Sequence, residues 1–308
     1  MAKCLGTYEH EQRITRLSFS VSDAKTTVLA RHSLRPRRYK RAEKCPVPAE
    51  WFYFEQSRCV LDMEEPSVVI EEVLGRSPQG KTLPFICRGD DGETYYVKGA
   101  GAGRRSLICE WVAAHLATAF GLPIADYVLA EVPTELITMG VRPDIRELGT
   151  GLVFASRLLP HAQELTPTTR DLVPDTTALD VLVFDWWLKN EDRHLTENGG
   201  NPNLLWDTTG EKLAVIDHNM AFDPDFSKEN FLESHVFAQL WNRVFSDHLL
   251  RKGYQNRMMA SLHDLPTVRA SIPDSWWWVD DGVPALITWD AIATCLDRCS
   301  HDDFWNIS

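Results

Sequence analysis

Residues 185–223 read DWWLKNEDRHLTENGGNPNLLWDTTGEKLAVIDHNMAFD, and their pattern is the most informative part of the sequence about fold and function. The polar run NEDRH at 190–194 interrupts a segment that is otherwise rich in Trp, Leu and Val. A loop that carries Asp, Arg, His and several Asn between apolar runs is either a solvated connection or a site. The elements on its two sides, and those earlier in the chain, distinguish the two interpretations.

Apolar elements flank this loop. The run ALDVLVFDWWLKN at 178–190 has Leu, Val and Trp at helical spacing, which predicts a helix that delivers the loop. After the loop, NLLWD at 203–207 and KLAVID at 212–217 are typical of short strands, and the Thr-Thr-Gly between them predicts a hairpin. Asp217 is therefore expected directly after a buried strand.

An earlier part of the chain predicts a strand-rich region. Strand composition is found at 67–75, 83–87 and 94–98, and the Asp-Gly pair at 91–92 predicts that the last two runs form a hairpin. Lys98 is expected to end the second strand of that hairpin. The later runs ADYVLAEV and GLVFASRLL predict two further strands.

Between these strands the run SLICEWVAAHLATAFG predicts a helix, which follows a Gly-rich link at 99–103. Ser106 is expected to cap the helix, and Gly121 to close it. Glu110 lies beside the apolar stripe and next to small Ala side chains. We therefore expect the helix to lie close to the sheet, with Glu110 directed towards it.

This order of features is the layout of phosphoryl transfer, which needs a cation on the nucleotide phosphates, carboxylate and amide oxygens on Mg²⁺, and an Asp beside the attacking hydroxyl. We expect Lys98 to hold the phosphates, with Glu110 fixing its ammonium. Asp192 is expected to be the base. Asp217 is expected to be one metal ligand, and Asn201 or Asn203 the other.

The residues also resemble a known family. The pattern Asn-x-Asp-Arg-His, then Asn-Pro-Asn-Leu-Leu, then Ile-Asp-His is similar to that of the HipA-like kinases, Ser/Thr protein kinases related in core to phosphoinositide kinases. The resemblance spans about residues 66 to 280. It implies that Asp192 is the catalytic Asp, Asn201 and Asp217 bind metal, and Lys98 binds the nucleotide. It also implies a toxin-type kinase that phosphorylates a translation component.

Two assignments stay open within this pattern. The LTENGG stretch lengthens the loop, so Asn198, Asn201 and Asn203 compete for the metal; Asn201 is favoured because its distance to the Leu-Leu run matches the family pattern. For the phosphate-facing loop we favour Ser77, Gly80 and Lys81, which lie between the first two predicted strands. The Gly-rich link at 99–103 follows the Lys instead of preceding it.

Each residue also has a structural explanation. An Asp192-Arg193 pair alone is more often a surface ion pair, and Lys98 at a strand end is usually solvated. Four such features in this order favour the kinase interpretation. His194 and His218 are interpreted as loop supports, because nothing else supplies a zinc ligand set.

Composition and charge bound the remaining classes. The chain has 308 residues, 44% hydrophobic and 25% charged, and seven Cys without a CxxC pair, which indicates a globular protein with free thiols. We expect it to be cytoplasmic, because no secretory signal or membrane-spanning run is recognised. The net charge is −12, yet seven Lys and Arg against one Glu stand together between Arg31 and Lys44.

That basic cluster has two interpretations. It is either a solvated arm or a docking site for an acidic or RNA-bound partner, and an antitoxin is a further candidate partner. Pro36 argues against a continuous membrane-surface helix through it, so no membrane partner is expected.

The sequence therefore predicts an α+β, two-lobed protein kinase-like fold. We expect an N-terminal extension of unknown role at 1–65, a strand-rich N-lobe at 66–156 and a mainly helical C-lobe at 157–308. The expected activity is ATP- and Mg²⁺-dependent transfer to a Ser or Thr hydroxyl of a protein substrate. The alternatives are a small-molecule or lipid kinase on the same fold, and a pseudokinase that serves as a binding module.

Overall fold

The structure is a computed structural model that describes residues 67–77, 83–140, 142–197 and 199–306. Its contacts divide the chain into Met1–Ser57 and Arg58–Ser308, and every described residue belongs to the second unit. The basic cluster between Arg31 and Lys44 lies outside the described residues, as do Gly80 and Lys81.

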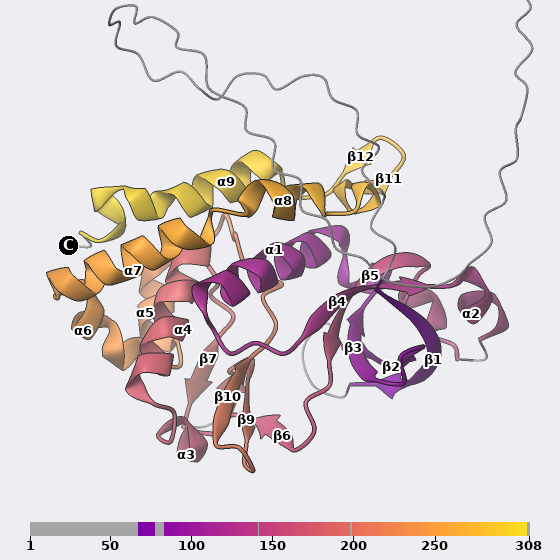
Figure 1. Ribbon diagram of the computed structural model, residues 1–308, viewed down its shortest axis with the longest axis horizontal. Helices are drawn as coiled ribbons and strands as arrows, with labels where there is room; N and C mark the ends of the chain where they lie inside the picture. The colour runs from indigo at the N-terminus through magenta and orange to yellow at the C-terminus, as the bar shows by residue number, and fades with distance from the viewer. Residues whose placement is uncertain (1–66, 78–82, 141, 198, 307–308) are drawn as a thin grey trace, which may run out of the picture. The chain divides into compact units, whose positions relative to one another are not determined.

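Five strands close a β-barrel (Figure 1). Around the barrel they follow the order β1 (Val68–Arg76), β2 (Phe85–Gly89), β3 (Thr94–Lys98), β5 (Gly151–Arg157) and β4 (Tyr127–Val132). Neighbours are antiparallel, except that β1 and β4 pair in parallel. The hairpin predicted at 91–92 and the position of Lys98 at the end of β3 are confirmed. Barrel closure was not predicted, because strand composition does not specify which edges pair.

Alternation along the barrel strands explains its core and singles out one residue. Phe85 and Cys87 on β2, and Tyr95 and Val97 on β3, point inwards and are buried, as the two-residue period of a strand requires. Lys98 breaks the pattern, since it follows Val97 and is itself only 7% exposed. A buried ammonium needs charged partners, so the end of β3 is a place to look for a site.

The helix α1 (Arg104–Phe120) links the barrel to the helical part of the chain. It begins at Arg104 after Gly103, whose φ of 82° favours glycine, so the expectation that Ser106 caps the helix is wrong: Ser106 lies inside the first turn. Gly121 closes the helix with a φ of 85°, as predicted. Twelve of its 17 residues are buried, because α1 packs against β5, α7 and α8 at once.

The helical part is built around α4 (Asp175–Leu188), the apolar helix predicted before the polar loop. Ten of the 14 residues of α4 are buried, and the helix packs against α9 (Trp289–Asp297). The chain beyond residue 230 is mostly helical. The other helices are α2 (Thr134–Met139), α3 (Pro167–Arg170), α5 (Lys228–Ser234), α6 (Trp241–Phe245), α7 (His248–Ser261) and α8 (Leu265–Ala270), with 3₁₀ turns at Ala100–Ala102, Ile145–Glu147, Ala238–Leu240, Asp274–Trp277, Arg298–Ser300 and Asp302–Phe304.

Small antiparallel sheets carry the polar loops. β9 (Leu204–Asp207) and β10 (Lys212–Val215) form the predicted hairpin, and β6 (Ala162–Glu164) adds to it. The LTENGG stretch, expected as a longer loop, forms a second hairpin of β7 (His194–Thr196) and β8 (Gly199–Asn201). A third hairpin joins β11 (Trp278–Asp280) and β12 (Val283–Pro284).

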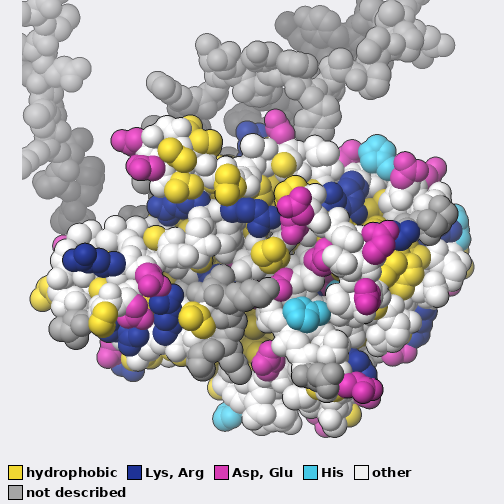
Figure 2. All heavy atoms as spheres, turned by 180° about the vertical axis from the view of Figure 1, so that it is seen from behind, with side chains coloured by type: hydrophobic (Ala, Val, Ile, Leu, Met, Phe, Trp, Pro, Cys, Tyr) yellow, Lys and Arg dark blue, Asp and Glu magenta, His cyan; other side chains and the backbone are white. Residues whose placement is uncertain are grey.

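The surface is chemically mixed. On the face shown in Figure 2, acidic and basic side chains are interspersed, with hydrophobic side chains between them. Within the described ranges, no helix has the length and apolar character to span a membrane.

Four cysteines of the described ranges, Cys87, Cys109, Cys295 and Cys299, are free and buried thiols. Of the three consecutive tryptophans, Trp276 is buried in the core, whereas Trp278 is 51% exposed.

Candidate active site

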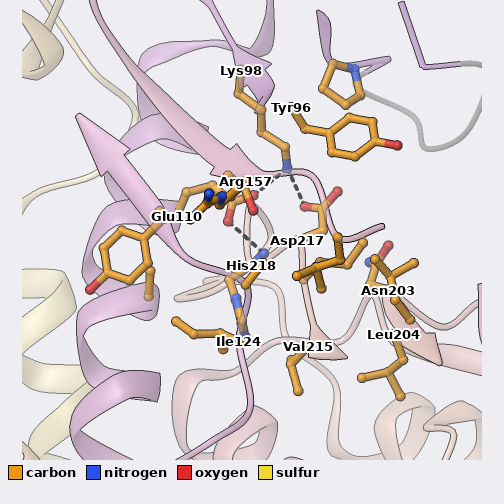
Figure 3. A pocket seen from close by; sticks show the side chains of 18 of the residues that line it. Tyr96, Lys98, Glu110, Ile124, Arg157, Asn203, Leu204, Val215, Asp217 and His218 are labelled. Atoms are coloured by element: carbon orange, nitrogen blue, oxygen red, sulfur yellow. Dashed lines mark hydrogen bonds and ion pairs between the residues drawn. The ribbon is translucent and has the colours of Figure 1, made fainter. Parts of the chain in front are cut away.

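A pocket lies between the barrel and the small sheet formed by β9 and β10 (Figure 3). One part of its wall is apolar and includes Ile124, Phe154, Leu204 and Val215. Another part is polar and charged, with Lys98, Glu110, Asn201, Asn203 and Asp217 among its residues. A concave site with apolar walls and a few convergent polar groups is the usual form of a small-molecule site.

Three charged side chains from separate elements meet at this pocket. Lys98 from β3 reaches between Glu110 of α1 and Asp217, which follows β10 (Figure 3). Its Nζ donates to Glu110 Oε1 and, at 2.6 Å, to Asp217 Oδ1. The second oxygen of Glu110 accepts from the backbone N–H of His218 at 3.1 Å, so Glu110 holds both the ammonium and the segment after Asp217.

The charges of this buried group do not balance, because one ammonium faces two carboxylates. Burial raises the pKa of Glu110 to about 7, although Lys98 lowers it, and the charge of Asp217 adds to the rise. Burial alone lowers the pKa of Lys98, but the two carboxylates outweigh it and raise that pKa above its ordinary value. Lys98 keeps the pKa of Asp217 low despite burial. Near pH 7 Glu110 is therefore only part ionised, and this group carries a partial excess of negative charge.

Close backbone packing brings Lys98 and Glu110 together. A Cβ on Gly99 would lie 2.0 Å from the Leu148 carbonyl oxygen, so only glycine fits directly after Lys98. The N–H of Ala100 donates to that same oxygen at 2.9 Å. The Gly-rich link thus allows close backbone approach and starts α1, which carries Glu110 back to β3.

The segment around Asp217 is held in an unusual conformation. Asp217 has a φ of 55°, in the left-handed region, and Phe222 has a φ of 60°. Such backbone in a bulky residue persists only where its surroundings enforce it. Arg105 supplies part of that enforcement, since its guanidinium donates to the carbonyls of Asn219 at 2.9 Å and Ala221 at 2.8 Å. A helix beginning with Arg is unfavourable for the helix dipole, which is the only sequence signal for this role.

The polar loop places Asp192 beside two asparagines. Asn201 Nδ2 donates to Asp192 Oδ2 at 2.9 Å, and Asn203 Nδ2 donates to the Asp192 carbonyl at 2.9 Å. Carboxylate and carbonyl oxygens only accept, so both amides must turn their nitrogens towards Asp192. The amide oxygens of Asn201 and Asn203 are thereby left to face other partners. Asn203, with a φ of 48°, is 7% exposed and lines the pocket.

These oxygens suit a hard divalent cation. Mg²⁺ takes few protein oxygens, typically one or two carboxylates, and fills its coordination with phosphate and water oxygens. The carboxylate of Asp217 and the amide oxygens of Asn201 and Asn203 provide that chemistry at the pocket wall. In the described part of the chain, no three His, Cys, Asp or Glu side chains gather as a metal site of their own.

Some of the other residues singled out from the sequence lie at the pocket wall, and others lie outside the described residues. Ser77 lies at the pocket wall and is 8% exposed. Gly80 and Lys81 lie outside the described residues, as does Asn198. His218 is a buried wall residue, and burial lowers its pKa to about 3, so it is neutral at physiological pH. His194 pairs with Asn201 across the β7–β8 hairpin.

Arg193, the residue after Asp192, is buried and is not part of a surface ion pair. Arg193 has no exposed surface, and its Nε donates to the buried carboxylate of Asp185 at 2.7 Å. His235 also contacts the Asp185 carboxylate. Neither Asp185 nor His235 was predicted to have a role. Asp185 sits in an apolar helical run, and a charged residue there is the signal that was available.

Comparison with known proteins gives the class. A family model for HipA-like kinases matches residues 70–308, so the chain belongs to the HipA-like kinase family. Kinases are phosphotransferases, and membership implies a nucleotide as phosphoryl donor. No curated protein matches the chain.

Two solved structures are distant neighbours. A Helicobacter pylori proinflammatory kinase, CtkA, has 13% identity and a TM-score of 0.41, covering 76% of this chain and 95% of that one. The FAT and kinase domain of CtTel1 has 15% identity and a TM-score of 0.27, covering 82% of this chain and 23% of that one. The assignment to the family rests on the family match.

Proposed function

We propose that this protein is an ATP- and Mg²⁺-dependent kinase that transfers the γ-phosphate to a Ser or Thr hydroxyl of a protein. The observation that carries the proposal is the meeting of Lys98, Glu110 and Asp217 at one pocket, beside the asparagines that hold Asp192. The barrel and the helical part would then be the two lobes of a kinase, with bounds near 66–156 and 157–308.

The apolar and the charged parts of the pocket wall suit the two parts of ATP, its adenine ring and its phosphates. The apolar wall, which includes Ile124, Phe154 and Val215, provides a surface for the adenine ring. Lys98 supplies a fixed positive charge for phosphate oxygens, and its bond to Glu110 prevents it from turning away. Ser77 is proposed to face the phosphates, together with Gly80 and Lys81, which lie outside the described residues.

Asp217, with Asn201 and Asn203, is proposed to hold Mg²⁺. Bound there, the ion would neutralise phosphate charge as it develops. The uneven charge of the site supports this role, because the excess carboxylate is stabilised by a cation.

Asp192 is proposed as the base. It would accept the proton of the attacking hydroxyl as that oxygen bonds to the γ-phosphorus and the bond to ADP breaks. Its carboxylate accepts from Asn201 and its backbone carbonyl accepts from Asn203, so both the side chain and the backbone of Asp192 are held for this step. Asp192 is partly buried, and it meets the pocket through these two wall residues.

A soluble protein is the proposed acceptor. A lipid kinase would be expected to carry a basic membrane-facing surface, each Lys or Arg adding about 1 kcal/mol near an anionic bilayer. The chain is net acidic, and the face in Figure 2 mixes both signs of charge. We propose a cytoplasmic enzyme of the toxin type, acting on a translation component, with Arg31–Lys44 as docking site for an acidic or RNA-bound partner or an antitoxin.

The test is to supply [γ-³²P]ATP and Mg²⁺ to purified protein with cell lysate or with anionic liposomes. The proposal predicts label in phosphoserine or phosphothreonine, and none when Asp192→Asn replaces the wild type. Label in lipid alone would establish the lipid-kinase alternative on the same site. Nucleotide binding without any transfer would establish the pseudokinase.

A further inference from the structure

A second charged group lies behind the site, and the proposed chemistry does not use it. We call Asp185, Arg193, His235 and Asn190 the buried network. Asp185 Oδ2 accepts from Arg193 Nε at 2.7 Å and lies 3.0 Å from His235 Nε2, and Asp185 Oδ1 accepts from Asn190 Nδ2 at 2.8 Å. Each of the four residues is at most 4% exposed.

The proton of His235 can be placed from its two contacts. Its Nδ1 accepts from the backbone N–H of Phe237 at 3.2 Å, so the ring proton is on Nε2 and is donated to Asp185. Burial lowers the pKa of His235, which keeps the ring neutral. Asp185 therefore has one counter-charge, the guanidinium of Arg193, and their charges cancel.

The other side of Arg193 faces the backbone of the proposed site. Its Nη1 donates to the carbonyls of Pro202 and Ile216, each at 3.2 Å, and to that of Asn203. Ile216 directly precedes Asp217, and Arg193 itself directly follows Asp192. One guanidinium thus joins the three segments that carry the proposed base and the proposed metal ligands.

We infer that Arg193 is the positioning residue that sets the spacing between Asp192, Asn203 and Asp217, and that Asp185 and His235 fix its guanidinium. The planar fork of Arg suits this task, because it bonds a carboxylate on one edge and carbonyl oxygens on the other. The inference rests on the proposed function, since it assigns a role in metal binding to residues that touch neither metal nor nucleotide.

A purely structural role makes a different prediction. If the network only stabilised the fold, weakening it would lower the melting temperature and affect every ligand alike. If it positions the metal ligands, Mg²⁺ binding should suffer while contacts made by Lys98 and the apolar wall persist. Residues that orient metal ligands from behind typically change metal affinity by about 10–100-fold.

The variants are Arg193→Lys and Asp185→Asn. Lysine keeps the charge of Arg193 but loses the fork. Asparagine keeps the shape of Asp185 and removes its charge, and its amide can donate to Asn190 Oδ1, which is buried without a partner. The matched control is Asp180→Asn with Arg257→Lys, because Asp180 lies on the same helix and binds Arg257 at 2.6 Å outside the pocket wall.

Melting temperature, ATP affinity in EDTA, ATP affinity against Mg²⁺ concentration, and kcat and KM are measured for each protein. Arg193→Lys and Asp185→Asn are expected to bind metal-free ATP within about twofold of wild type, while half-saturating Mg²⁺ rises about 10–100-fold and kcat falls. The control pair is expected to lower the melting temperature without changing the Mg²⁺ requirement.

A gentler pair covers the case in which these variants do not fold. His235→Gln retains a donor for Asp185 and should stay closer to wild type in Mg²⁺ requirement than His235→Leu, which removes it. An unchanged Mg²⁺ requirement in the folded variants, or equal loss of metal-free and Mg²⁺-dependent ATP binding, overturns the inference. Wild type that binds Mg²⁺·ATP but transfers nothing sinks the proposed function alone, whereas wild type that does not bind ATP overturns both.

Discussion

The two buried charged groups of this protein differ in how completely they are satisfied. In the pocket triad, by which we mean Lys98, Glu110 and Asp217, one cation faces two carboxylates at the wall of a pocket. In the buried network, the charges of Asp185 and Arg193 cancel, and the remaining Arg193 donors bond backbone carbonyls. The side chains of Asp185 and Arg193 are 1% and 0% exposed, against 16% for Asp217.

This difference indicates what each group is for. A buried charge is stable when its partners are complete, and the network meets that condition without any ligand. The pocket triad retains excess negative charge beside an opening, which is the condition of a site that awaits a cation. Mutations in the two groups should therefore have separable effects.

The largest effect is expected from the carboxylates of the proposed chemistry. Asp192→Asn should lower kcat by about 10²–10⁴-fold, because it removes the group that takes the hydroxyl proton. Asp217→Asn should abolish the Mg²⁺ dependence of ATP binding, while the far-ultraviolet circular dichroism spectrum stays that of wild type. Near wild-type, Mg²⁺-dependent activity of Asp217→Asn would show that the metal is held elsewhere.

Lys98→Met should come next, with turnover lowered by about 10²–10³-fold, because the fixed charge facing the phosphates is lost. Glu110→Ala should cost about tenfold, since Lys98 keeps its bond to Asp217. Steady-state kinetics with varied ATP measure both. Lys98→Arg is the control, because it keeps a cation, and activity of Lys98→Met equal to wild type contradicts the assignment of β3 to the nucleotide.

The effect of pH on kcat/KM should be smaller than the effects of these substitutions, and it reports on the ionisation of Glu110. Glu110 has a pKa raised from 4.5 to about 7, so ionised Glu110 holds Lys98 only above that value, and kcat/KM should fall as pH drops through about 7. Stability runs the other way: the unfolded state releases the proton first, so unfolding free energy falls as pH rises from 4.5 to 7. Glu110→Gln should flatten both profiles. An unchanged acid limb in Glu110→Gln assigns the limb to another group.

The smallest effect is expected outside both groups. Gly121→Ala places a Cβ at a φ of 85°, where it meets Arg257 Nη2 at an ordinary contact distance of 4.0 Å, so the cost is backbone strain of about 1 kcal/mol. The melting temperature should fall by about 2–4 °C. Calorimetry with an ATP titration checks this, and a change in Mg²⁺ requirement would mean that the helix end influences the site.

Much of the fold followed from local sequence. The hairpin at 91–92, the end of α1 at Gly121 and the β9–β10 hairpin are fixed by turn residues and short-range periodicity. Barrel closure depends on β1 meeting β4 about sixty residues away, and no local pattern encodes that pairing. The start of α1 was misplaced because Ser106 has the composition of a cap, whereas Gly103 has the required backbone conformation.

The site shows the same division. Lys98, Asp192 and Asp217 stand at element ends, where sequence patterns point to chemistry, and their roles remain proposals. Arg105 contacts Ala221, which is 116 positions away. Asp185 contacts Arg193 and His235, which are 8 and 50 positions away, so only the folded chain reveals these roles. The sequence left open which asparagine binds the metal. The structure brings both Asn201 and Asn203 to Asp192.

Transfer of ³²P from [γ-³²P]ATP by purified protein in lysate, with Mg²⁺ or with EDTA, for wild type and Asp217→Asn tests whether the pocket is a kinase site whose metal is held by Asp217. Labelled phosphoserine or phosphothreonine is expected only for wild type with Mg²⁺. Equal labelling by Asp217→Asn, or no transfer by folded wild-type protein that binds ATP, would contradict this expectation.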